Sequence, residues 1–302
     1  MQAIILIHSG KANLPEIDAY KTYFTNRGYK IEIKYIDEIS NKDNYGDEIL
    51  WFFMGFYPRK FNAKYIIHDY RSLSVGKFSR LKNFFKKHFQ QKPDLRIFLN
   101  KNVYRELGFT DDVPALFLDM GVPEFVFDFK NSNNFEYDFI YVGDVSFERR
   151  IDLLIENFIT SFCGKKKLLI VGSYEKGIKD KYKDHKNIIF TGKVTQKEVF
   201  QYVRKTDICL SFTPDKYPHY FQTPTKLLEY AALGKKIIMS NIASNVETSK
   251  KFGINAYISN NFKFPSETEL TSINGNEHID YRNFLWEKQI STSGIEHFLQ
   301  GL

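Results

Sequence analysis

The sequence predicts an α/β protein built from two domains that each contain a parallel β-sheet. Short apolar runs alternate with segments of helical spacing in both halves of the chain, which is the pattern of parallel strands joined by crossover helices. Residues 128–136, rich in Asn, Ser and charge, interrupt this alternation and predict a linker. The 302 residues suffice for two cores. We therefore expect one domain over residues 1–125 and another over residues 126–302.

The first half opens with a strand, a polar loop and a helix. Residues 3–8 form an apolar β-run, and residues 14–26 have helical spacing that ends at Gly28. Loops at this end of a parallel sheet face the ligand, so Gly10 is a candidate contact. Neither a Walker loop nor a Gly-x-Gly-x-x-Gly fingerprint is present, which argues against a P-loop ATPase and a dinucleotide oxidoreductase. Further strands are predicted at residues 30–35, 50–54, 65–68, 95–99 and 115–117.

The second half repeats the alternation of strands and helices and predicts a second parallel sheet. The tail, residues 281–302, has the spacing of a helix. The predicted strands of this half are residues 139–142, 168–171, 188–191, 208–210, 237–239 and 256–258.

The stretch from Phe221 to Lys236 predicts a short helix that leads into a buried strand. Thr223 suits the helix cap, Pro224 suits the first helical position, and Gly234 suits the stop. The N-terminus of such a helix offers unpaired backbone N–H groups to an anion.

Two charged residues of this helix extend the predicted anion site. Lys226 and Glu229 lie three residues apart, on one face and close to the helix N-terminus. This arrangement suits a nucleoside diphosphate, because the helix end and Lys226 bind phosphate while Glu229 accepts hydrogen bonds from ribose hydroxyls. An ordinary amphipathic helix with an exposed Lys–Glu pair is the alternative.

Three motifs resemble those of GT-B glycosyltransferases related to glycosyltransferase family 4. Residues 224–234 resemble the Pro-x-Lys-x-x-Glu-Tyr-x-Ala-x-Gly segment of that family, and residues 139–154 resemble the strand, loop and helix that open its donor domain. Residues 187–199 resemble the strand and loop that face the nucleobase. The resemblance implies a GT-B fold, in which two Rossmann-like domains face a cleft. Residues 1–125 would then be the acceptor side and residues 126–302 the donor side, with the C-terminal helix packing back on the first domain.

The resemblance also implies roles for single residues. Arg149 matches the second cation of the family's Gly-Arg-x-x-x-x-Lys-Gly pattern, whereas Asp144 stands at the first cation position and Arg150 stands where Gly is usual. Glu229 matches the ribose-binding member of a Glu-x7-Glu motif, whose first position is Phe221 here. The donor-site residues that we expect from these matches are Gly10, Gly143, Arg149, Lys193, Gln222, Thr223, Thr225, Lys226 and Glu229.

A His–Asp pair in the first half is the candidate for catalysis. His68 and Asp69 stand at the end of a predicted strand, so we expect them at the ligand edge of the sheet, where they resemble a His-containing loop that reaches the donor sugar. Such a pair could act as an acid–base couple. The alternative is a His that caps the strand end, with Arg71 pairing with Asp69.

Several other chemistries lack support in the sequence. There is no Cys–His cluster with metal-ligand spacing, no Ser-His-Asp order and no Asp-x-Asp motif. We therefore expect no metal and no cofactor, only a nucleoside-diphosphate sugar as donor substrate. Two distant cysteines, with no signal peptide and no membrane-spanning run, predict a cytoplasmic protein or one attached to the inner face of the membrane.

The resemblance implies a retaining hexosyltransferase that moves a sugar to a glycan or lipid-linked acceptor in bacterial surface polysaccharide synthesis. The departures at Asp144 and Phe221 leave a second interpretation open, a non-catalytic GT-B subunit that binds nucleotide or glycan for a partner. Nucleic acid is not an expected partner, because the sequence contains no recognisable RNA- or DNA-binding module.

The segment over residues 76–92 predicts a basic amphipathic helix. It contains six Lys or Arg residues and no acidic residue, and its phenylalanines gather on one side at a helical period. One interpretation is a helix that binds an anionic membrane surface. The other is a helix whose phenylalanines pack into the core while its basic side is solvated.

Overall fold

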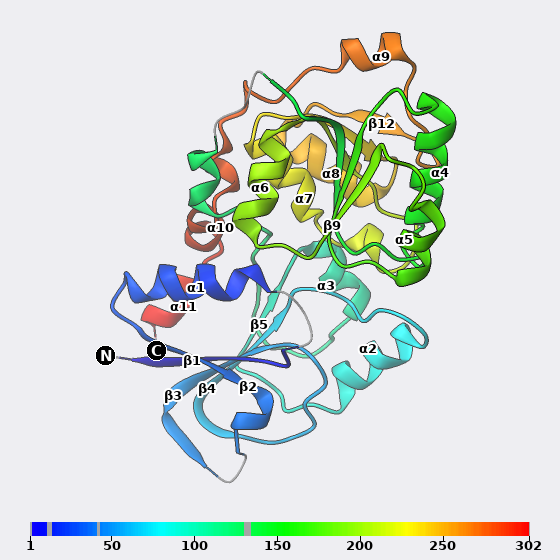
Figure 1. The fold of residues 1–302 in the computed structure, drawn as a ribbon. Coiled ribbons are helices and arrows are strands. Elements are labelled where there is room, and N and C mark those ends of the chain that lie inside the picture. The colour runs from blue at the N-terminus through cyan, green and yellow to red at the C-terminus, as the bar shows by residue number, and fades with distance from the viewer. Residues whose placement is uncertain (1, 11–13, 41–42, 130–133, 302) are drawn as a thin grey trace. The chain divides into compact units, whose positions relative to one another are not determined.

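The computed structural model describes residues 2–10, 14–40, 43–129 and 134–301 (Figure 1). The chain divides into two compact units. Unit 1 comprises Met1–Pro123, Phe221–Thr223 and Asn283–Leu302, and unit 2 comprises Glu124–Tyr220 and Pro224–Arg282. No helix in these described stretches is long and apolar enough to cross a membrane.

Unit 1 is built on a parallel six-stranded sheet in the order β2-β1-β3-β4-β5-β6. The order reverses next to β1, which places a topological switch point between β1 and β3. Its strands are β1 Ala3–His8, β2 Lys30–Tyr35, β3 Asn44–Phe53, β4 Asn62–Tyr70, β5 Leu95–Phe98 and β6 Ala115–Phe117. Its helices are α1 Pro15–Thr25, α2 Ser79–His88, α3 Lys101–Leu107, α10 Trp286–Thr292 and α11 Ile295–Gln300.

Large aromatic side chains fill the core between α1 and the sheet of unit 1. The Tyr20 ring lies 4.9 Å from that of Trp51, and the Phe24 ring lies 5.7 Å from the same indole. These side chains are fully buried, and each ring buries more apolar area than an aliphatic residue would. Much of the aromatic content of the sequence is therefore used in packing.

The C-terminal tail packs within unit 1. Val122 N donates to Phe284 O at 2.8 Å, and Trp286 N donates to Val122 O at 3.1 Å. Tyr23 Oη on α1 donates to the Glu296 carboxylate on α11 at 2.7 Å, and the two helices lie side by side in Figure 1.

Unit 2 contains a second parallel six-stranded sheet, in the order β12-β11-β10-β7-β8-β9. Here the order reverses between β7 and β10. The strands are β7 Tyr137–Val142, β8 Leu168–Val171, β9 Ile188–Gly192, β10 Thr206–Ser211, β11 Lys236–Ser240 and β12 Tyr257–Ser259. The helices are α4 Ile151–Phe162, α5 Lys176–Tyr182, α6 Gln196–Arg204, α7 Thr225–Ala232, α8 Ala243–Phe252 and α9 Glu267–Ser272.

Helices cover both faces of this second sheet (Figure 1). Buried residues of α4 and α5 share one core cluster with side chains from one face of the sheet, while α6 and α7 contact β10 from the other face. The predicted fold class, two parallel-sheet α/β domains, is confirmed.

The change from unit 1 to unit 2 falls between Pro123 and Glu124, ahead of the segment whose composition predicts a linker. The Phe125 and Phe129 rings each lie 5.6 Å from the Phe200 ring of α6, which ties this stretch to unit 2. Residues 130–133 of the predicted linker lie outside the described residues.

Candidate functional site

Three neighbouring strands of unit 2 end in glycine at the carboxyl edge of the sheet. Gly143 follows β7, Gly172 follows β8, and Gly192 closes β9. Their backbones are hydrogen-bonded in series, with Gly143 N donating to Val171 O at 2.9 Å and Gly172 N donating to Gly192 O at 3.0 Å. The lack of a side chain at Gly172 lets these strand ends pack closely, because an added Cβ atom would overlap the carbonyl oxygen of Gly143.

The segment after Gly143 carries an acid and a cation that contact each other. Arg149 Nε lies 3.8 Å from Asp144 Oδ2, and both side chains are partly exposed. Tyr141 Oη donates to Asp144 O at 3.2 Å, which holds the start of this segment against the end of β7. The acid that stands at the family's first cation position therefore offsets part of the charge of the second cation.

Arg150, the N-cap residue of α4, has the left-handed backbone conformation, with φ 57° and ψ 34°. This conformation costs a residue with a Cβ atom about 1–2 kcal/mol, whereas Gly adopts it freely. The departure from the Gly that is usual at this position therefore leaves strain in the backbone.

We expect Arg150→Gly to raise the free energy of unfolding by about 1 kcal/mol, because it relieves this strain. Urea unfolding of the variant and the wild type measures the difference. The matched control is Arg204→Gly at the end of α6, where the backbone is helical and glycine should destabilise. A loss of stability in Arg150→Gly would show that interactions of the arginine side chain outweigh the strain.

Helix α7 begins one residue later than the sequence predicts. Pro224 is the N-cap residue and makes no side-chain cap, so the prediction that Thr223 caps the helix is wrong. The reason is a competing acceptor, since Thr223 Oγ1 donates to Asp119 Oδ1 at 2.5 Å within unit 1. Gly234 follows the end of the helix with φ 68°, as its predicted role as the stop requires.

Lys226 and Glu229 form a close ion pair in the first turns of α7. Lys226 Nζ lies 2.6 Å from Glu229 Oε2, and Gln196 Nε2 donates to Glu229 Oε1 at 3.1 Å. The Glu229 side chain is only 2% exposed, so the alternative of an exposed pair on an ordinary surface helix does not hold. Gln196 stands at the start of α6, whose first turn is set by the Thr195–Glu198 capping box.

His219 is a neighbour of this site that the sequence does not single out. Burial, followed by the charges of Arg149 and Lys216, lowers the pKa of His219 to about 4, while Glu148 opposes the shift. Ser244 Oγ, at the start of α8, donates to His219 O at 3.1 Å and holds the segment in place. The imidazole is therefore neutral at neutral pH and can accept or donate a hydrogen bond near Arg149.

The predicted donor-site residues divide between the two units. Gly143, Arg149, Lys193, Thr225, Lys226 and Glu229 belong to unit 2, whereas Gly10, Gln222 and Thr223 belong to unit 1. Lys193 is exposed and follows Gly192 directly. Within the described part of the chain, no group of three or more His, Cys, Asp or Glu side chains could hold a metal ion.

The predicted position of His68 and Asp69 is wrong, because β4 continues to Tyr70 and both residues lie inside the strand. Successive side chains of a strand point to opposite faces, so the two cannot form an acid–base couple. Burial and the charge of Arg96 lower the pKa of His68 to about 3.

On the other face, Asp69 accepts hydrogen bonds from Tyr20 Oη at 3.0 Å and Trp51 Nε1 at 3.2 Å. Burial raises the pKa of Asp69 to about 6, against the opposing charge of Arg71. Arg71 pairs with Asp69 at 3.9 Å and with the buried Glu16 at 3.4 Å. The Arg71–Asp69 pair of the alternative interpretation is therefore present, whereas its His at the strand end is not, because His68 lies inside β4.

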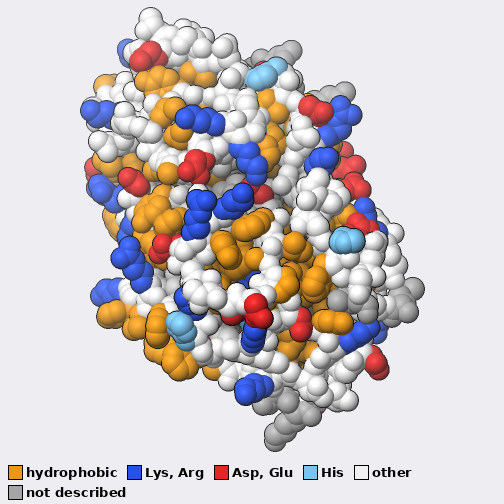
Figure 2. Space-filling model, turned by 180° about the vertical axis from the view of Figure 1, so that it is seen from behind, with side chains coloured by type: hydrophobic (Ala, Val, Ile, Leu, Met, Phe, Trp, Pro, Cys, Tyr) orange, Lys and Arg blue, Asp and Glu red, His pale blue; other side chains and the backbone are white. Residues whose placement is uncertain are grey.

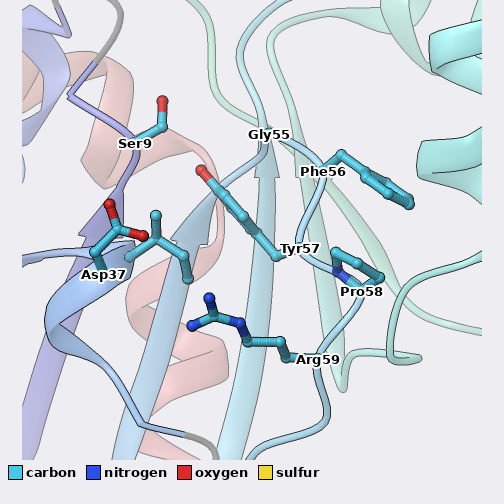
Figure 3. A pocket seen from close by; sticks show the side chains of 8 residues that line it. Ser9, Asp37, Gly55, Phe56, Tyr57, Pro58 and Arg59 are labelled. Atoms are coloured by element: carbon cyan, nitrogen blue, oxygen red, sulfur yellow. The ribbon is translucent and has the colours of Figure 1, made fainter.

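Unit 1 has a pocket of about 350 Å³ at its switch point. It is lined by residues that follow β1, β2 and β3, and Figure 3 shows Ser9, Asp37, Tyr57 and Arg59 around it. Tyr57 Oη donates to Phe53 O at 3.0 Å, which fixes the ring across the strand end. A hydroxyl, a carboxylate, a phenol and a guanidinium are groups that can bind a polyhydroxylated ligand.

Gly10 lies beside this pocket with φ 70°, and its N–H contacts His8 Nδ1 at 3.3 Å. A Cβ atom at this position would lie 2.9 Å from a carbon of the Tyr35 ring, so the loop needs glycine both for its backbone conformation and for space.

Comparisons with known proteins bear on this geometry. Residues 136–264 match the family model described as Glycosyl transferases group 1. No curated protein matches the sequence. Among solved structures, Anabaena HepE in complex with UDP and glucose is 13% identical, with a TM-score of 0.66 over 100% of both chains.

Two further solved structures are similar over nearly their whole lengths. AviGT4, a glycosyltransferase involved in avilamycin A biosynthesis, is 11% identical with a TM-score of 0.65 over 98% of this chain and 97% of that one. The lipopolysaccharide outer core galactosyltransferase WaaB in its apo form is 12% identical with a TM-score of 0.57 over 98% and 99%. At these identities the likeness shows the fold, which is GT-B as predicted.

Proposed function

We propose that this protein, which has the GT-B fold and a group 1 glycosyltransferase domain over residues 136–264, transfers a sugar from a nucleoside-diphosphate sugar to a glycan or lipid-linked acceptor. The observation that carries the proposal is the buried pairing of Glu229 with Lys226 and Gln196 at the start of α7. Because α7 follows β10 in a parallel sheet, its N-terminus lies at the same sheet edge as the glycine strand ends.

The carboxyl edge of the unit 2 sheet has to stabilise the diphosphate as it leaves the sugar. As the bond from the sugar to the diphosphate breaks and a bond to an acceptor hydroxyl forms, negative charge gathers on the diphosphate. Fixed cations and backbone N–H groups stabilise that charge without a proton transfer of their own. Lys226, Arg149 and the first N–H groups of α7 are the groups that we assign to it, and we assign no metal and no further cofactor.

Donor binding would exchange the partners of Glu229. In the structure both carboxylate oxygens are occupied, one by Lys226 and the other by Gln196. The Lys226 side chain is 33% exposed and can turn toward a phosphate, which releases Glu229 Oε2 to accept a ribose hydroxyl. The pair would thus hold Glu229 in position until the nucleotide arrives.

We propose a hexosyl group, retention at the anomeric carbon and a role in bacterial surface polysaccharide synthesis at the cytoplasmic side of the membrane. The resemblance to glycosyltransferase family 4 supports retention, and the fold shared with the lipopolysaccharide galactosyltransferase WaaB supports the setting. The complex of HepE with UDP makes UDP the first nucleotide to test.

The second candidate is a non-catalytic subunit that binds nucleotide or glycan for a partner enzyme. Two observations favour it. Asp144, which pairs with Arg149, stands where the family has its first cation, and Phe221 stands where the family has the carboxylate that touches the donor sugar. The Phe221 carbonyl is held by Asn100 Nδ2 at 2.9 Å, so this backbone segment is positioned within unit 1 in spite of the substitution.

A thermal-shift screen of UDP-, GDP-, ADP- and CMP-sugars tests donor binding. A matched donor at about a hundred times its dissociation constant should stabilise the fold by roughly 2.7 kcal/mol. No shift with any donor, at millimolar concentration and confirmed by calorimetry, would remove the donor-site assignment. Binding without turnover would favour the non-catalytic subunit.

Replacing Lys226 by Ala should weaken nucleoside diphosphate binding by about 10- to 100-fold, since a charge-assisted hydrogen bond contributes roughly 1.5–3 kcal/mol. Nucleoside monophosphate binding should fall less, because the second phosphate is missing. Isothermal titration calorimetry measures both.

The matched control for this prediction is Lys236→Ala, which removes a lysine of similar exposure, 34% against 33%, from the amino end of β11. Lys226→Gln serves as a second variant, because the amide keeps a hydrogen bond to Glu229 and so separates phosphate binding from local stability. Equal weakening of diphosphate and monophosphate binding would take Lys226 out of the phosphate site.

A further inference from the structure

Helix α2 of unit 1 turns its apolar side to the solvent. Of its residues only Asn83 is buried. Large apolar side chains of the helix and its two flanking residues are exposed, namely Phe78 at 76%, Leu81 at 51%, Phe84 at 51%, Phe85 at 40% and Phe89 at 55%. An ordinary amphipathic helix of an α/β domain buries that side.

The side of α2 that faces the protein is polar. Asn83 Oδ1 accepts a hydrogen bond from Ser74 N at 3.0 Å, and Lys87 Nζ donates to Gly108 O at the end of α3. Burial, with the charge of Lys82 as a lesser cause, lowers the pKa of Lys86 to about 8. The interpretation in which the phenylalanines pack into the core is therefore wrong, because the helix is attached through its polar side.

The exposed rings form one continuous patch. The Phe84 ring lies 4.5 Å from the His88 ring and 6.1 Å from the Phe85 ring, which in turn lies 5.3 Å from Phe89. Phe56, in the loop after β3, extends the patch with its ring 6.1 Å from Phe85. We call Phe56, Phe78, Leu81, Phe84, Phe85 and Phe89 the α2 patch.

Basic side chains surround the α2 patch, and hydrophobic and basic side chains lie together over this part of unit 1 in Figure 2. From residue 76 to residue 92 there is no acidic residue, and the cations are Lys77, Arg80, Lys82, Lys86, Lys87 and Lys92. Lys77, Arg80, Lys82 and Lys92 are exposed, with Lys92 paired to Asp112 at 2.6 Å, whereas Lys86 and Lys87 are only partly exposed.

We propose that the α2 patch docks on an anionic membrane surface, with its rings at the boundary between headgroups and acyl chains and its cations against the headgroups. Exposed aromatic side chains next to basic ones suit this surface, where each cation adds to the attraction. A second copy of this chain fits the patch less well. The protein carries a net charge of +7, and self-association through α2 would bring two all-basic segments together.

This proposal does not depend on sugar transfer, but it would place the pocket of unit 1 near the membrane. Phe56 lines that pocket, and in Figure 3 its side chain points away from Tyr57 and Arg59. If the proposed function also holds, a lipid-linked acceptor would meet the protein beside this pocket.

Co-sedimentation of the full chain with phosphatidylcholine vesicles containing a rising fraction of phosphatidylglycerol tests the docking. We expect no binding to neutral vesicles and binding that increases with the anionic fraction and decreases with salt. Phe84→Ser combined with Phe85→Ser should lower the partition coefficient at least about tenfold. Lys77→Gln combined with Arg80→Gln should lower it about fivefold for each charge removed.

The matched control is Lys250→Gln combined with Lys251→Gln, which removes two exposed charges from the last turn of α8 and should leave partitioning nearly unchanged. All variants replace exposed side chains, so their melting temperatures should match the wild type and show that each variant is folded. Absence of vesicle binding at low salt, or equal partitioning of wild type and α2 variants, would overturn the proposal. So would a concentration-dependent dimer, measured by light scattering without vesicles, that the Phe84→Ser and Phe85→Ser changes abolish.

Discussion

Replacing Gly172 by Ala is expected to lower the free energy of unfolding by about 3–5 kcal/mol, since backbone strain and overpacking act together. Gly172 has φ 141°, a conformation that residues with a side chain rarely adopt. A Cβ atom there would overlap the carbonyl oxygen of Gly143 and lie 2.8 Å from its carbonyl carbon. Both clashing atoms belong to the backbone at the end of β7, so they cannot move aside as a flexible side chain can.

Gly164→Ala is the matched control for this variant. Gly164 also has a positive φ, 82°, but nothing lies within 4 Å of its added Cβ atom, so only the backbone cost of about 1–2 kcal/mol should remain. Urea unfolding of both variants measures the difference. Equal losses of stability would mean that β7 and β8 separate easily at this edge, which would contradict the close packing of Gly172 against Gly143.

The second large effect is a dependence of the free energy of unfolding on pH, which arises from the Asp69 carboxyl group. Its pKa is raised by burial from 3.8 to about 6, while Arg71 opposes the shift and Glu16 adds to it. A carboxyl group whose pKa is raised in the folded state adds to the free energy of unfolding while it is protonated. This added stability is fully present below pH 3.8 and is lost as the pH rises through 6. Two pKa units correspond to about 3 kcal/mol. We expect wild type to lose about that much stability relative to Asp69→Asn between pH 4 and pH 7.

The measurement is the difference in unfolding free energy between wild type and Asp69→Asn at several pH values. Taking the difference cancels the contribution of His68, whose lowered pKa acts in the opposite direction. Asp112→Asn, at an exposed aspartate paired with Lys92, should show no such divergence. A constant difference from pH 4 to pH 7 would contradict the raised pKa, and a slope of the opposite sign would mean that Arg71 holds Asp69 ionised.

Most strands of both sheets could be predicted because they are short apolar runs bounded by turn residues. The error was one of length. β4 extends from residue 62 to residue 70, and its last three residues, His68, Asp69 and Tyr70, include two polar ones that end the apolar pattern early. Asp69 is buried with partners because Tyr20 and Trp51 donate hydrogen bonds to it from distant parts of the chain, and no local pattern contains that information.

In the candidate site, too, residues that are close in sequence could be predicted, whereas residues brought in by packing could not. Lys226 and Glu229 are close in sequence, so helical spacing alone places them together. Gln196 and His219 join the site only through the packing of α6 and the loop before α7, which the sequence does not indicate. For α2, periodicity identifies the apolar side of the helix but cannot tell whether that side faces the core or the solvent.

The central claim is that this protein moves a sugar from a nucleoside diphosphate to an acceptor, and the most direct test is nucleoside diphosphate release. The donors are UDP-, GDP- and ADP-hexoses, each incubated with and without a panel of glycosides and a bacterial lipid extract as acceptors. We predict one donor whose release of nucleoside diphosphate rises when an acceptor is added, with at least tenfold loss in Lys226→Ala and none in Lys236→Ala. A donor that binds with Lys226-dependent affinity but releases no nucleoside diphosphate with any acceptor would contradict the account and favour the non-catalytic subunit.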